Sequence, residues 1–375
     1  MSTEAVVSAI KESGSTRSSL RIAGRSTWLD AGRPVRADKT LSLRHDSGVV
    51  SYVPGDLTLT VRAGTPLSEI ERVTREHDQW LPLDPYGSPD GTIGATIATA
   101  SAGPLASSFG LPRDLLLGLE FVNGRGDVVR GGGKVVKNVA GFDLSRLLTG
   151  SWGTLGVITE VTLRLYALPK ADRTFAVALK GSKKEVASLV RAIVMSPLTP
   201  FALQLLNPPV VRALDIGEHP VCLIRLGGNE AAVDVQLRAL SSLADSKEVD
   251  TAVWDGLRNL ENGAECVLRI SGLPASFREV SAAMLSDEYP WISEYIDPVR
   301  GVLRLVLRAP DDAAASEDSV LGIDPAGRPD EHVVFEQLPG ESWDGIPSAV
   351  SDSLSQGVKK AYDPHNILNP GILGD

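Results

Sequence analysis

The sequence has few cysteines and no long hydrophobic run, and each absence excludes a class of protein. Only Cys222 and Cys266 occur in 375 residues, too few for a disulfide framework, a four-cysteine iron–sulfur cluster or a cysteine zinc site. We expect both to be buried thiols in a reducing compartment. No apolar run approaches the ~20 residues that span a bilayer, and the first fifteen residues lack the pattern of a signal peptide. The sequence therefore predicts a cytoplasmic protein.

A basic block is also absent, and the net charge is −10 at pH 7. This charge argues against nucleic acid or an anionic membrane as the main partner. It does not exclude a small anionic ligand, because backbone N–H groups can bind one locally. The composition, 43 % hydrophobic and 22 % charged residues, is that of a globular protein, and the length allows two or three domains.

Several common catalytic motifs are missing. No G-x-G-x-x-G opens a helix after a strand, and no G-x-x-x-x-G-K-[ST] occurs, which argues against Rossmann and P-loop folds. No G-x-S-x-G elbow is present. The histidines form no HxH or HExxH pair, so we expect no metal site; they are His45, His77, His219, His332 and His365. The sequence identifies no catalytic residue.

Short apolar segments between glycines indicate strands in the first 169 residues. We predict strands at Leu20–Gly24 and Leu57–Gly64, and a hairpin over 115–130 that turns at Asn123–Gly126. A long strand is expected over 156–168.

Capping residues predict two helices in the same region. Thr65 is expected to N-cap a helix with Pro66 in its first position. Asp143 is expected to N-cap a short helix over 144–148, which Gly150 would end.

Beyond Lys170 glycine becomes rarer, and apolar strands alternate with amphipathic helical stretches. Strands are predicted at 173–180, 221–226, 266–270 and 301–308, with helices at 183–195, 230–244 and 277–285. This pattern predicts an α+β domain with an antiparallel sheet over 171–340. Residues 311–319 are expected to form a polar loop or a weak helix, and 350–362 a helix that leads into the tail DPHNILNPG (Asp363–Gly371).

Three segments carry more glycine and small residues than regular structure favours. They are IAGRSTWL (Ile22–Leu29), PDGTIGATIATASAG (Pro89–Gly103) and DLSRLLTGSWGTLGVITEV (Asp143–Val161). Each segment alone is consistent with ordinary tight turns. Together they indicate a long ligand laid against the backbone, because only glycine allows so close an approach.

In this order, the segments and the tail resemble the PCMH-type FAD-binding domain of the vanillyl-alcohol oxidase and p-cresol methylhydroxylase flavoproteins. The resemblance implies an α+β fold: an FAD-binding domain of two α+β subdomains over 1–170, a cap over 171–340, and a helix and tail over 341–375 that return to the flavin. It implies that the turn Gly24, Arg25, Ser26 and Thr27 cradles the pyrophosphate. It also implies cofactor contacts at Gly91, Thr92, Ile93, Gly94, Thr99, Ser101 and Gly103, at Gly153, Gly156, Val157 and Ile158, and at Asn369.

Within this superfamily, the segment from 131 to 169 closely resembles the FAD-binding E subunits of bacterial glycolate oxidases. The resemblance rests on Lys137, Asn138, the turn at Gly141–Asp143, and Trp152 where many relatives carry glutamate. A solvated lysine beside a hairpin is the alternative interpretation of Lys137.

Two departures from the wider family limit the chemistry that the resemblance implies. The turn AGRSTW has no histidine or cysteine for covalent attachment, so we expect non-covalent FAD. The H-x-G-D-G-N-x-H-type segment of catalytic relatives, which serves metal and substrate, is also missing. The resemblance therefore implies an accessory subunit that works with a D-like flavoprotein subunit and an iron–sulfur subunit, in a complex that oxidises a small 2-hydroxyacid.

In such an oxidation a hydride passes to the flavin while a base takes the hydroxyl proton. Attachment of this cytoplasmic chain to the inner face of a membrane would come through its partners. Two alternatives stay open: a self-sufficient FAD-dependent 2-hydroxyacid dehydrogenase, and a non-catalytic scaffold. The substrate and the electron acceptor are not predicted.

Overall fold

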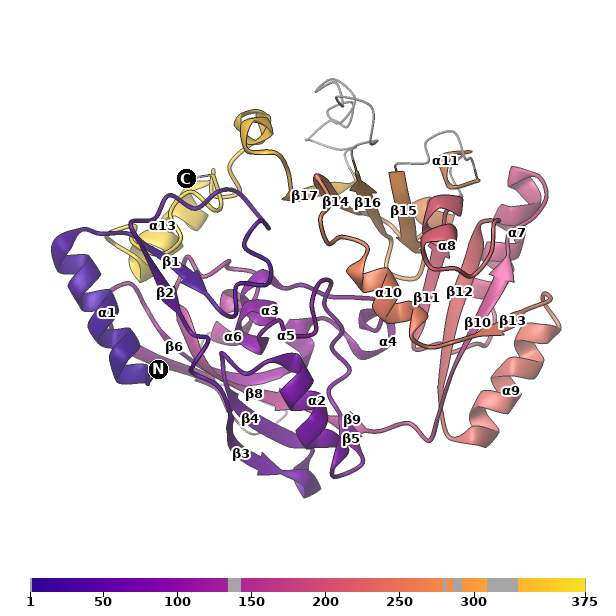
Figure 1. The fold of residues 1–375 in the computed structure, drawn as a ribbon, viewed down its shortest axis with the longest axis horizontal. Coiled ribbons are helices and arrows are strands. Elements are labelled where there is room, and N and C mark those ends of the chain that lie inside the picture. The colour runs from indigo at the N-terminus through magenta and orange to yellow at the C-terminus, as the bar shows by residue number, and fades with distance from the viewer. Residues whose placement is uncertain (1, 134–142, 279–281, 286–291, 309–329, 375) are drawn as a thin grey trace. The chain divides into compact units, whose positions relative to one another are not determined.

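The computed structural model (Figure 1) describes residues 2–133, 143–278, 282–285, 292–308 and 330–374. The chain divides into two compact units. Unit 1 comprises Met1–Gly103, Phe109–Leu168 and Asp344–Asp375, and unit 2 comprises Pro104–Ser108 and Pro169–Trp343. The predictions for Lys137, Asn138, Gly141, Phe142 and 311–319 concern residues outside the described ranges.

Unit 1 is built on a five-stranded antiparallel sheet with the order β3-β4-β8-β6-β7. Its strands are β3 (Val49–Val53), β4 (Thr58–Arg62), β6 (Leu116–Val122), β7 (Val128–Gly132) and β8 (Val157–Arg164). Two small sheets accompany it: parallel β1 (Leu20–Ala23) and β2 (Lys39–Ser42), and antiparallel β5 (Gln79–Trp80) and β9 (Tyr166–Ala167). The predicted strands and the β6–β7 hairpin are confirmed.

The helices of unit 1 are short apart from the N-terminal one, which was not predicted. They are α1 (Thr3–Thr16), α2 (Leu67–Arg75), α3 (Ile93–Thr99), α5 (Pro112–Leu115), α6 (Leu144–Leu148) and α13 (Ser353–Tyr362); α4 (Ala106–Phe109) lies at the boundary of the units. Within the described ranges of both units, 3₁₀ turns occur at Pro54–Asp56, Ser276–Arg278 and Gly340–Gly345.

The capping predictions are half right. The Asp143 carboxylate accepts a hydrogen bond from the Arg146 N–H at 3.0 Å, and Gly150 follows α6 with φ +81°, as predicted. The N-cap of α2, however, is Pro66 and not Thr65. The Thr65 hydroxyl donates to the Arg62 carbonyl at 2.6 Å instead, because it closes the turn that precedes the helix.

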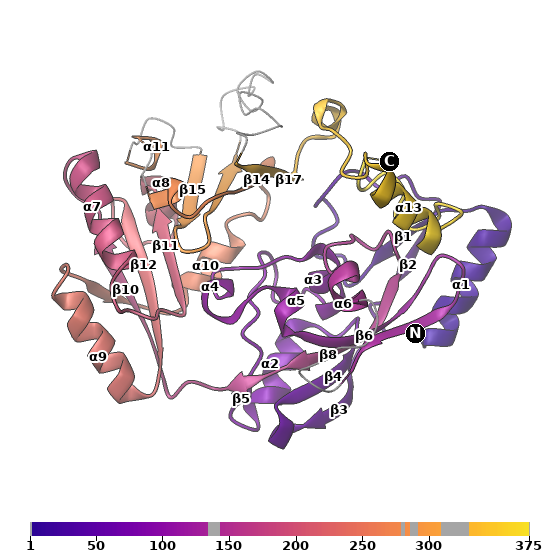
Figure 2. The same ribbon diagram turned by 180° about the vertical axis from the view of Figure 1, so that it is seen from behind.

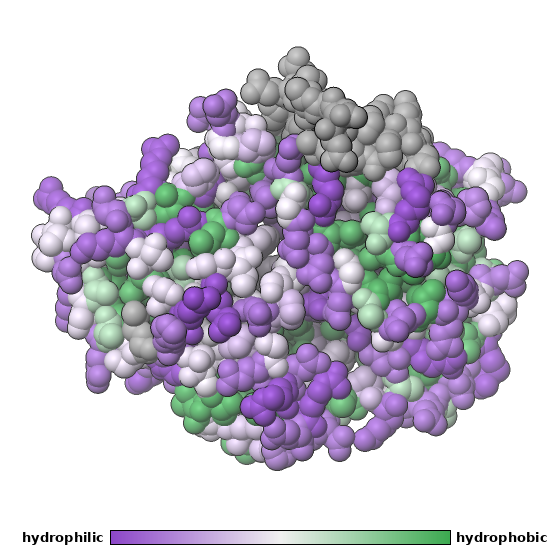
Figure 3. All heavy atoms as spheres, in the orientation of Figure 1, coloured by the Kyte–Doolittle hydropathy of each residue, from purple (hydrophilic) through white to green (hydrophobic). Residues whose placement is uncertain are grey.

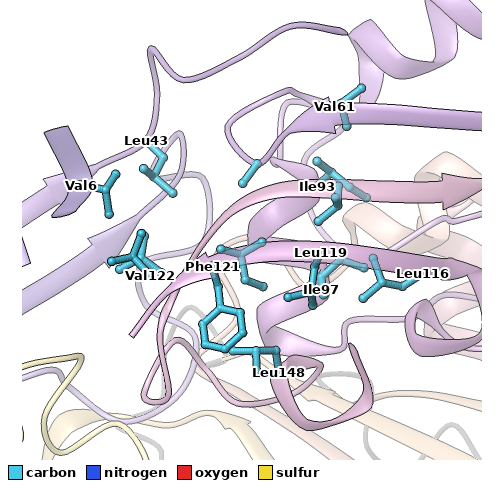
Figure 4. Packing of buried hydrophobic residues seen from close by; sticks show 14 of the residues in the cluster. Val6, Leu43, Val61, Ile93, Ile97, Leu116, Leu119, Phe121, Val122 and Leu148 are labelled. Atoms are coloured by element: carbon cyan, nitrogen blue, oxygen red, sulfur yellow. The ribbon is translucent and has the colours of Figure 1, made fainter. Parts of the chain in front are cut away.

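The core of unit 1 lies between the large sheet and the helices α1, α3 and α6. Ile93 and Ile97 stand one turn apart on one face of α3 and are fully buried. Phe121 of β6 is also fully buried, and its ring lies beside Leu148 of α6 (Figure 4). Burial of such a ring contributes about 1.5–3 kcal/mol, so contacts of Phe121 hold α6 and the sheet together.

Unit 2 contains an eight-stranded antiparallel sheet with the order β13-β10-β12-β11-β15-β16-β14-β17. The strands are β10 (Ala171–Ala178), β11 (Ala202–Leu206), β12 (Val221–Gly228), β13 (Lys247–Val249), β14 (Cys266–Ser271), β15 (Ile292–Asp297), β16 (Val302–Leu307) and β17 (His332–Gln337). The predicted α+β class with an antiparallel sheet is confirmed, although β11, β13, β15 and β17 were not predicted.

Helices lie on both faces of this sheet. They are α7 (Lys183–Val194), α8 (Pro208–Ala213), α9 (Glu230–Ser241), α10 (Val253–Asn259) and α11 (Ala282–Leu285). Figures 1 and 2 show α7 and α9 on one face and α10 on the other. Cys222 and Cys266 are buried within the unit, which confirms the prediction of buried thiols.

The surface mixes polar and apolar residues (Figure 3). In unit 1 the edge strand β3 exposes Val49, Val50 and Val53. Over the described ranges, every helix is too short or too polar to cross a membrane.

Candidate functional site

A cavity in unit 1 is lined by four segments that are far apart in sequence. The N-terminal turn contributes Gly24, Arg25, Ser26 and Thr27; the second segment Thr92, Gly94 and Thr99; the third Gly153, Gly156 and Ile158; and the tail Asn369. These residues were singled out from the sequence, and the fold brings them together around one space.

Five other candidate residues are not on the cavity wall. Ile93 and Val157 are fully buried in the core of unit 1. A Cβ on Gly103 would lie 1.8 Å from the Asp84 carbonyl oxygen, so this glycine packs against neighbouring backbone. Gly91 and Ser101 are half-buried outside the cavity.

The N-terminal turn Gly24–Thr27 follows β1 and offers unused backbone donors. Ser26 has φ +62°, in the left-handed region. Across the described ranges, no protein group accepts a hydrogen bond from the N–H of Arg25, Ser26 or Thr27. A turn that changes handedness can direct successive N–H groups to one side, where they bind an anion.

Glycine at position 24 is required by the packing of this turn on the second segment. A Cβ there would lie 2.3 Å from the Thr92 hydroxyl oxygen. That hydroxyl also accepts a hydrogen bond from the Ala95 N–H, at 3.4 Å, as the N-cap of α3. The start of α3 therefore fixes the position of the N-terminal turn.

The glycine turn Gly150–Gly156 packs against the other end of α3. The N–H of Gly150 donates to the Ile97 carbonyl at 3.1 Å, and the N–H of Trp152 donates to the Ala98 carbonyl at 2.8 Å. Trp152 has φ +53°, an outlier for a bulky side chain. Such strain costs roughly 1–3 kcal/mol and persists only where the surroundings impose it.

Protein atoms occupy the space that a side chain would need at Gly153 and at Gly156, the two glycines that were expected to contact a cofactor. A Cβ on Gly156 would lie 2.5 Å from Cδ2 of Phe121, inside the core. A Cβ on Gly153, which has φ +72°, would lie 2.8 Å from the amide nitrogen of Asn369. Both residues line the cavity, but the missing side chains are explained by packing of the protein on itself.

Asn369 joins the tail to two walls of the cavity. Its amide nitrogen donates to the Trp152 carbonyl at 2.7 Å, and its amide oxygen accepts from the Ile22 N–H at 2.7 Å. Its own N–H donates to the Leu20 carbonyl at 2.9 Å. The side chain is thus occupied in holding β1 and the glycine turn at a fixed spacing, a role that sequence alone did not predict.

Two tryptophans on the wall, Trp28 and Trp152, were also missed as site residues. Their ring centroids are 6.2 Å apart with planes inclined by 32°. Gly32 allows this arrangement, because a Cβ there would lie 2.9 Å from the Trp152 ring. Trp28 could have been noticed in the sequence, because it ends the turn sequence AGRSTW. Its pairing with Trp152, far away in the chain, could not.

Ionisable groups are scarce on the cavity wall. Of the described residues that line it, only Arg21 and Arg25 carry ionisable side chains. The guanidinium of Arg21 donates to the Leu29 carbonyl, which secures the chain after the N-terminal turn. Over the described ranges no group of three metal-ligating side chains occurs. The cavity can therefore bind a ligand through backbone donors and aromatic rings, and the side chains described on its wall include no carboxylate, imidazole or lysine.

Comparison with known proteins places the chain in a family. A model described as FAD binding domain matches residues 1–132. The glycolate oxidase subunit GlcE of Escherichia coli (strain K12) is 36 % identical, over 99 % of this chain and 97 % of the relative. The chain belongs to the GlcE family. The glycolate oxidase subunit GlcD of Bacillus subtilis (strain 168) is 28 % identical, over 93 % of this chain and 82 % of its own.

Solved structures share the fold of the GlcE-family chain at low identity. A p-cresol methylhydroxylase with bound substrate has a TM-score of 0.71 at 14 % identity, covering 100 % of this chain and 87 % of its own. An alkyldihydroxyacetonephosphate synthase has a TM-score of 0.66 at 15 % identity, covering 98 % of this chain and 74 % of its own. The predicted PCMH-type fold is confirmed.

FAD is the cofactor that the domain match and the GlcE relationship support, as predicted. The cavity wall also fits such a molecule. The open N–H groups of the N-terminal turn suit a pyrophosphate, and the tryptophans suit an aromatic ring. FAD would supply a two-electron acceptor for oxidation.

Proposed function

We propose that this chain is the FAD-binding accessory subunit of a complex that oxidises glycolate or a related 2-hydroxyacid. The observation that carries the proposal is the 36 % identity to the GlcE subunit of glycolate oxidase over almost the whole length of both chains. The partners that we propose are a D-like flavoprotein subunit and an iron–sulfur subunit. A location in the cytoplasm, with membrane attachment only through partners, is part of the same proposal.

In this proposal the residues of unit 1 bind and position the cofactor without moving protons. The N–H groups of Arg25, Ser26 and Thr27 hold the pyrophosphate, and we expect non-covalent attachment because no histidine or cysteine stands in this turn. Asn369 holds β1 and the glycine turn at the spacing that the cofactor needs. Thr92 and Thr99, at the two ends of α3, form the floor of the same site.

The proposed division of labour rests on the sequence. Removal of a hydroxyl proton from a 2-hydroxyacid needs a base, and this chain lacks the H-x-G-D-G-N-x-H-type segment that serves metal and substrate in catalytic relatives. We therefore assign the proton transfer to the D-like subunit, and the transfer of electrons onward to the iron–sulfur subunit.

A self-sufficient FAD-dependent 2-hydroxyacid dehydrogenase is the second candidate. It is favoured by likeness to a relative that is named as a dehydrogenase and not as a subunit, the D-2-hydroxyglutarate dehydrogenase of Xanthomonas citri pv. viticola (strain LMG 965), which is 27 % identical over 93 % of this chain. The absence of the H-x-G-D-G-N-x-H-type segment from the sequence weighs against it.

Reconstitution of the subunits tests the proposal. The tagged chain is expressed alone and with D-like and iron–sulfur subunits from the same source, and each preparation is assayed for glycolate- and lactate-dependent dye reduction. We expect the three proteins to co-purify, and turnover to need the D-like subunit. Turnover by this chain alone at the rate of the full set would favour the self-sufficient enzyme, and failure to associate would reject the accessory role.

A further inference from the structure

Trp28 and Trp152 form a paired aromatic wall in the unit 1 cavity that the core does not explain. Both rings are half-buried and both line the cavity. Neither residue belongs to the hydrophobic core cluster of unit 1 or to the partly buried residues packed against it. The pair is therefore held at the cavity by local structure and not by burial in the core.

The local structure that holds Trp152 is strained. Its φ of +53° is unfavourable for a bulky residue. Two hydrogen bonds of its backbone impose this conformation: its N–H donates to the Ala98 carbonyl, and its carbonyl accepts from the side-chain amide of Asn369. Gly32, at φ +74°, leaves the space into which the ring fits. Strain that several contacts impose on one residue at a cavity is a common mark of a functional site.

The size of the cavity and the position of the tryptophan pair indicate which ring of a ligand the pair would contact. The cavity has a volume of ≈ 130 Å³, and an engineered cavity of about 150 Å³ in another protein binds benzene. The space thus suits one small ring system better than the three fused rings of a flavin. Trp28 directly follows the turn whose N–H groups suit the pyrophosphate. A ligand ring that meets the pair therefore lies close to the phosphates.

We infer that Trp28 and Trp152 form the stacking surface for the adenine ring of FAD, which makes this pair a determinant of affinity and of the preference for adenine-containing ligands over FMN. This inference rests on the proposed binding of FAD in the cavity. Stacking of a base on aromatic side chains contributes without any charged group, in accord with a wall that carries no carboxylate among its described residues.

Tryptophan fluorescence of the deflavinated chain, titrated with ADP, tests the inference. ADP carries adenine and pyrophosphate but no flavin. Unlike FAD, it therefore cannot quench distant tryptophans by energy transfer to the flavin. We expect ADP to change the emission of the wild type and FMN to leave it unchanged. The Trp28→Phe/Trp152→Phe variant should lose the ADP signal while FAD binding persists, because phenylalanine keeps an aromatic face.

Trp80→Phe is the matched control, since Trp80 lies in unit 1 against Phe109 and away from the cavity wall. It should keep the full ADP response. The Trp28→Ala/Trp152→Ala variant should bind FAD about tenfold more weakly or worse, with circular dichroism that shows a folded chain.

The outcomes separate this inference from the proposed function. An ADP signal that survives in the double phenylalanine variant, or that disappears in Trp80→Phe, places the adenine elsewhere and overturns the inference. FMN that competes with ADP also overturns it. A wild-type chain that binds neither FAD nor ADP contradicts the proposed function itself.

Discussion

The side-chain amide of Asn369 donates a hydrogen bond of 2.7 Å to the backbone oxygen of Trp152, a residue 217 positions earlier in the chain. The other end of the same amide accepts from Ile22 at the end of β1. One side chain thus sets the distance between two walls of the cavity, and the tail of the protein becomes part of the site.

Replacement of Asn369 by aspartate should weaken both the fold and the cofactor site. The carboxylate can still accept from Ile22, but it has no donor for the Trp152 carbonyl. Loss of this hydrogen bond, which leaves a partly buried carbonyl without this partner, should lower the free energy of unfolding by about 1–3 kcal/mol. If the substitution destabilises the FAD-bound form by about 1 kcal/mol more than the free form, the dissociation constant of FAD rises about fivefold.

Asn366→Asp provides the control for that prediction. Asn366 lies in the same tail and has a similar left-handed backbone, φ +49° against +46° for Asn369, but it is exposed and lies outside the cavity wall. Chemical denaturation and FAD titration of both variants should therefore show an effect only at Asn369. Equal effects at the two positions would mean that tail conformation, and not the bond to Trp152, is responsible.

Gly156→Ala should destabilise unit 1 through its core. The new Cβ would lie 2.5 Å from the Phe121 ring and 3.0 Å from the Val122 carbonyl oxygen, and overpacking of this kind costs about 1–3 kcal/mol. Phe121→Leu removes the ring edge, so the double variant should be more stable than the sum of the single losses predicts. Thermal unfolding of the three variants measures this coupling.

Gly150→Ala should behave differently, because the Cβ there would meet only Ala100, at 3.4 Å. Its φ of +81° makes the loss on the order of 1 kcal/mol, and FAD should stay bound. A coupling near zero between positions 156 and 121 would contradict the packing explanation for Gly156.

The cysteines should be unreactive in the folded protein. Burial raises the pKa of Cys222 to about 12, and burial together with Glu265 raises that of Cys266 to about 12. Since the thiolate is the nucleophile, a thiol reagent at pH 8 should label neither cysteine in native protein and both after denaturation. Any slow labelling of the native protein should become faster as the pH is raised from 8 towards the pKa of about 12. Rapid stoichiometric labelling of native protein at pH 8 would contradict the burial.

Arg304→Met should destabilise unit 2 strongly. The guanidinium of Arg304 is 4 % exposed and bonds the Glu261 carboxylate at 2.6 Å and that of Glu336 at 2.5 Å. Removal of the cation from such a buried network costs about 3–5 kcal/mol. Arg173→Met is the control, because its pair with Glu248 lies on an exposed part of the same sheet and should cost at most about 1 kcal/mol. Similar losses for both variants, measured by denaturant unfolding, would contradict this account.

Much of the fold was predictable because local signals agree with tertiary structure. The strand β1, the β6–β7 hairpin and helix α6 follow from alternation, a glycine-containing turn and an aspartate cap. The cap of α2 was misplaced by one residue because the Thr65 hydroxyl bonds the preceding turn. Edge and central strands such as β13 and β15 carry weak alternation and depend on their neighbours for pairing.

The candidate site was predictable only as a set of segments. The glycine-rich stretches identify which parts of the chain line the cavity, but not what each glycine accommodates. That Gly156 faces Phe121, and that Gly153 faces Asn369, are consequences of tertiary packing. The pairing of Trp28 with Trp152 and the bridging role of Asn369 join residues far apart in sequence, and no local pattern encodes such contacts.

The flavin content of the purified chain decides whether it binds FAD, and how. The chain is purified, precipitated with acid, and the flavin in supernatant and pellet is identified and quantified against protein. We expect FAD in an amount equal to that of the chain, all of it in the supernatant, because the N-terminal turn holds the pyrophosphate without a covalent bond. A chain that takes up no FAD, or flavin that remains with the denatured protein, would contradict this expectation.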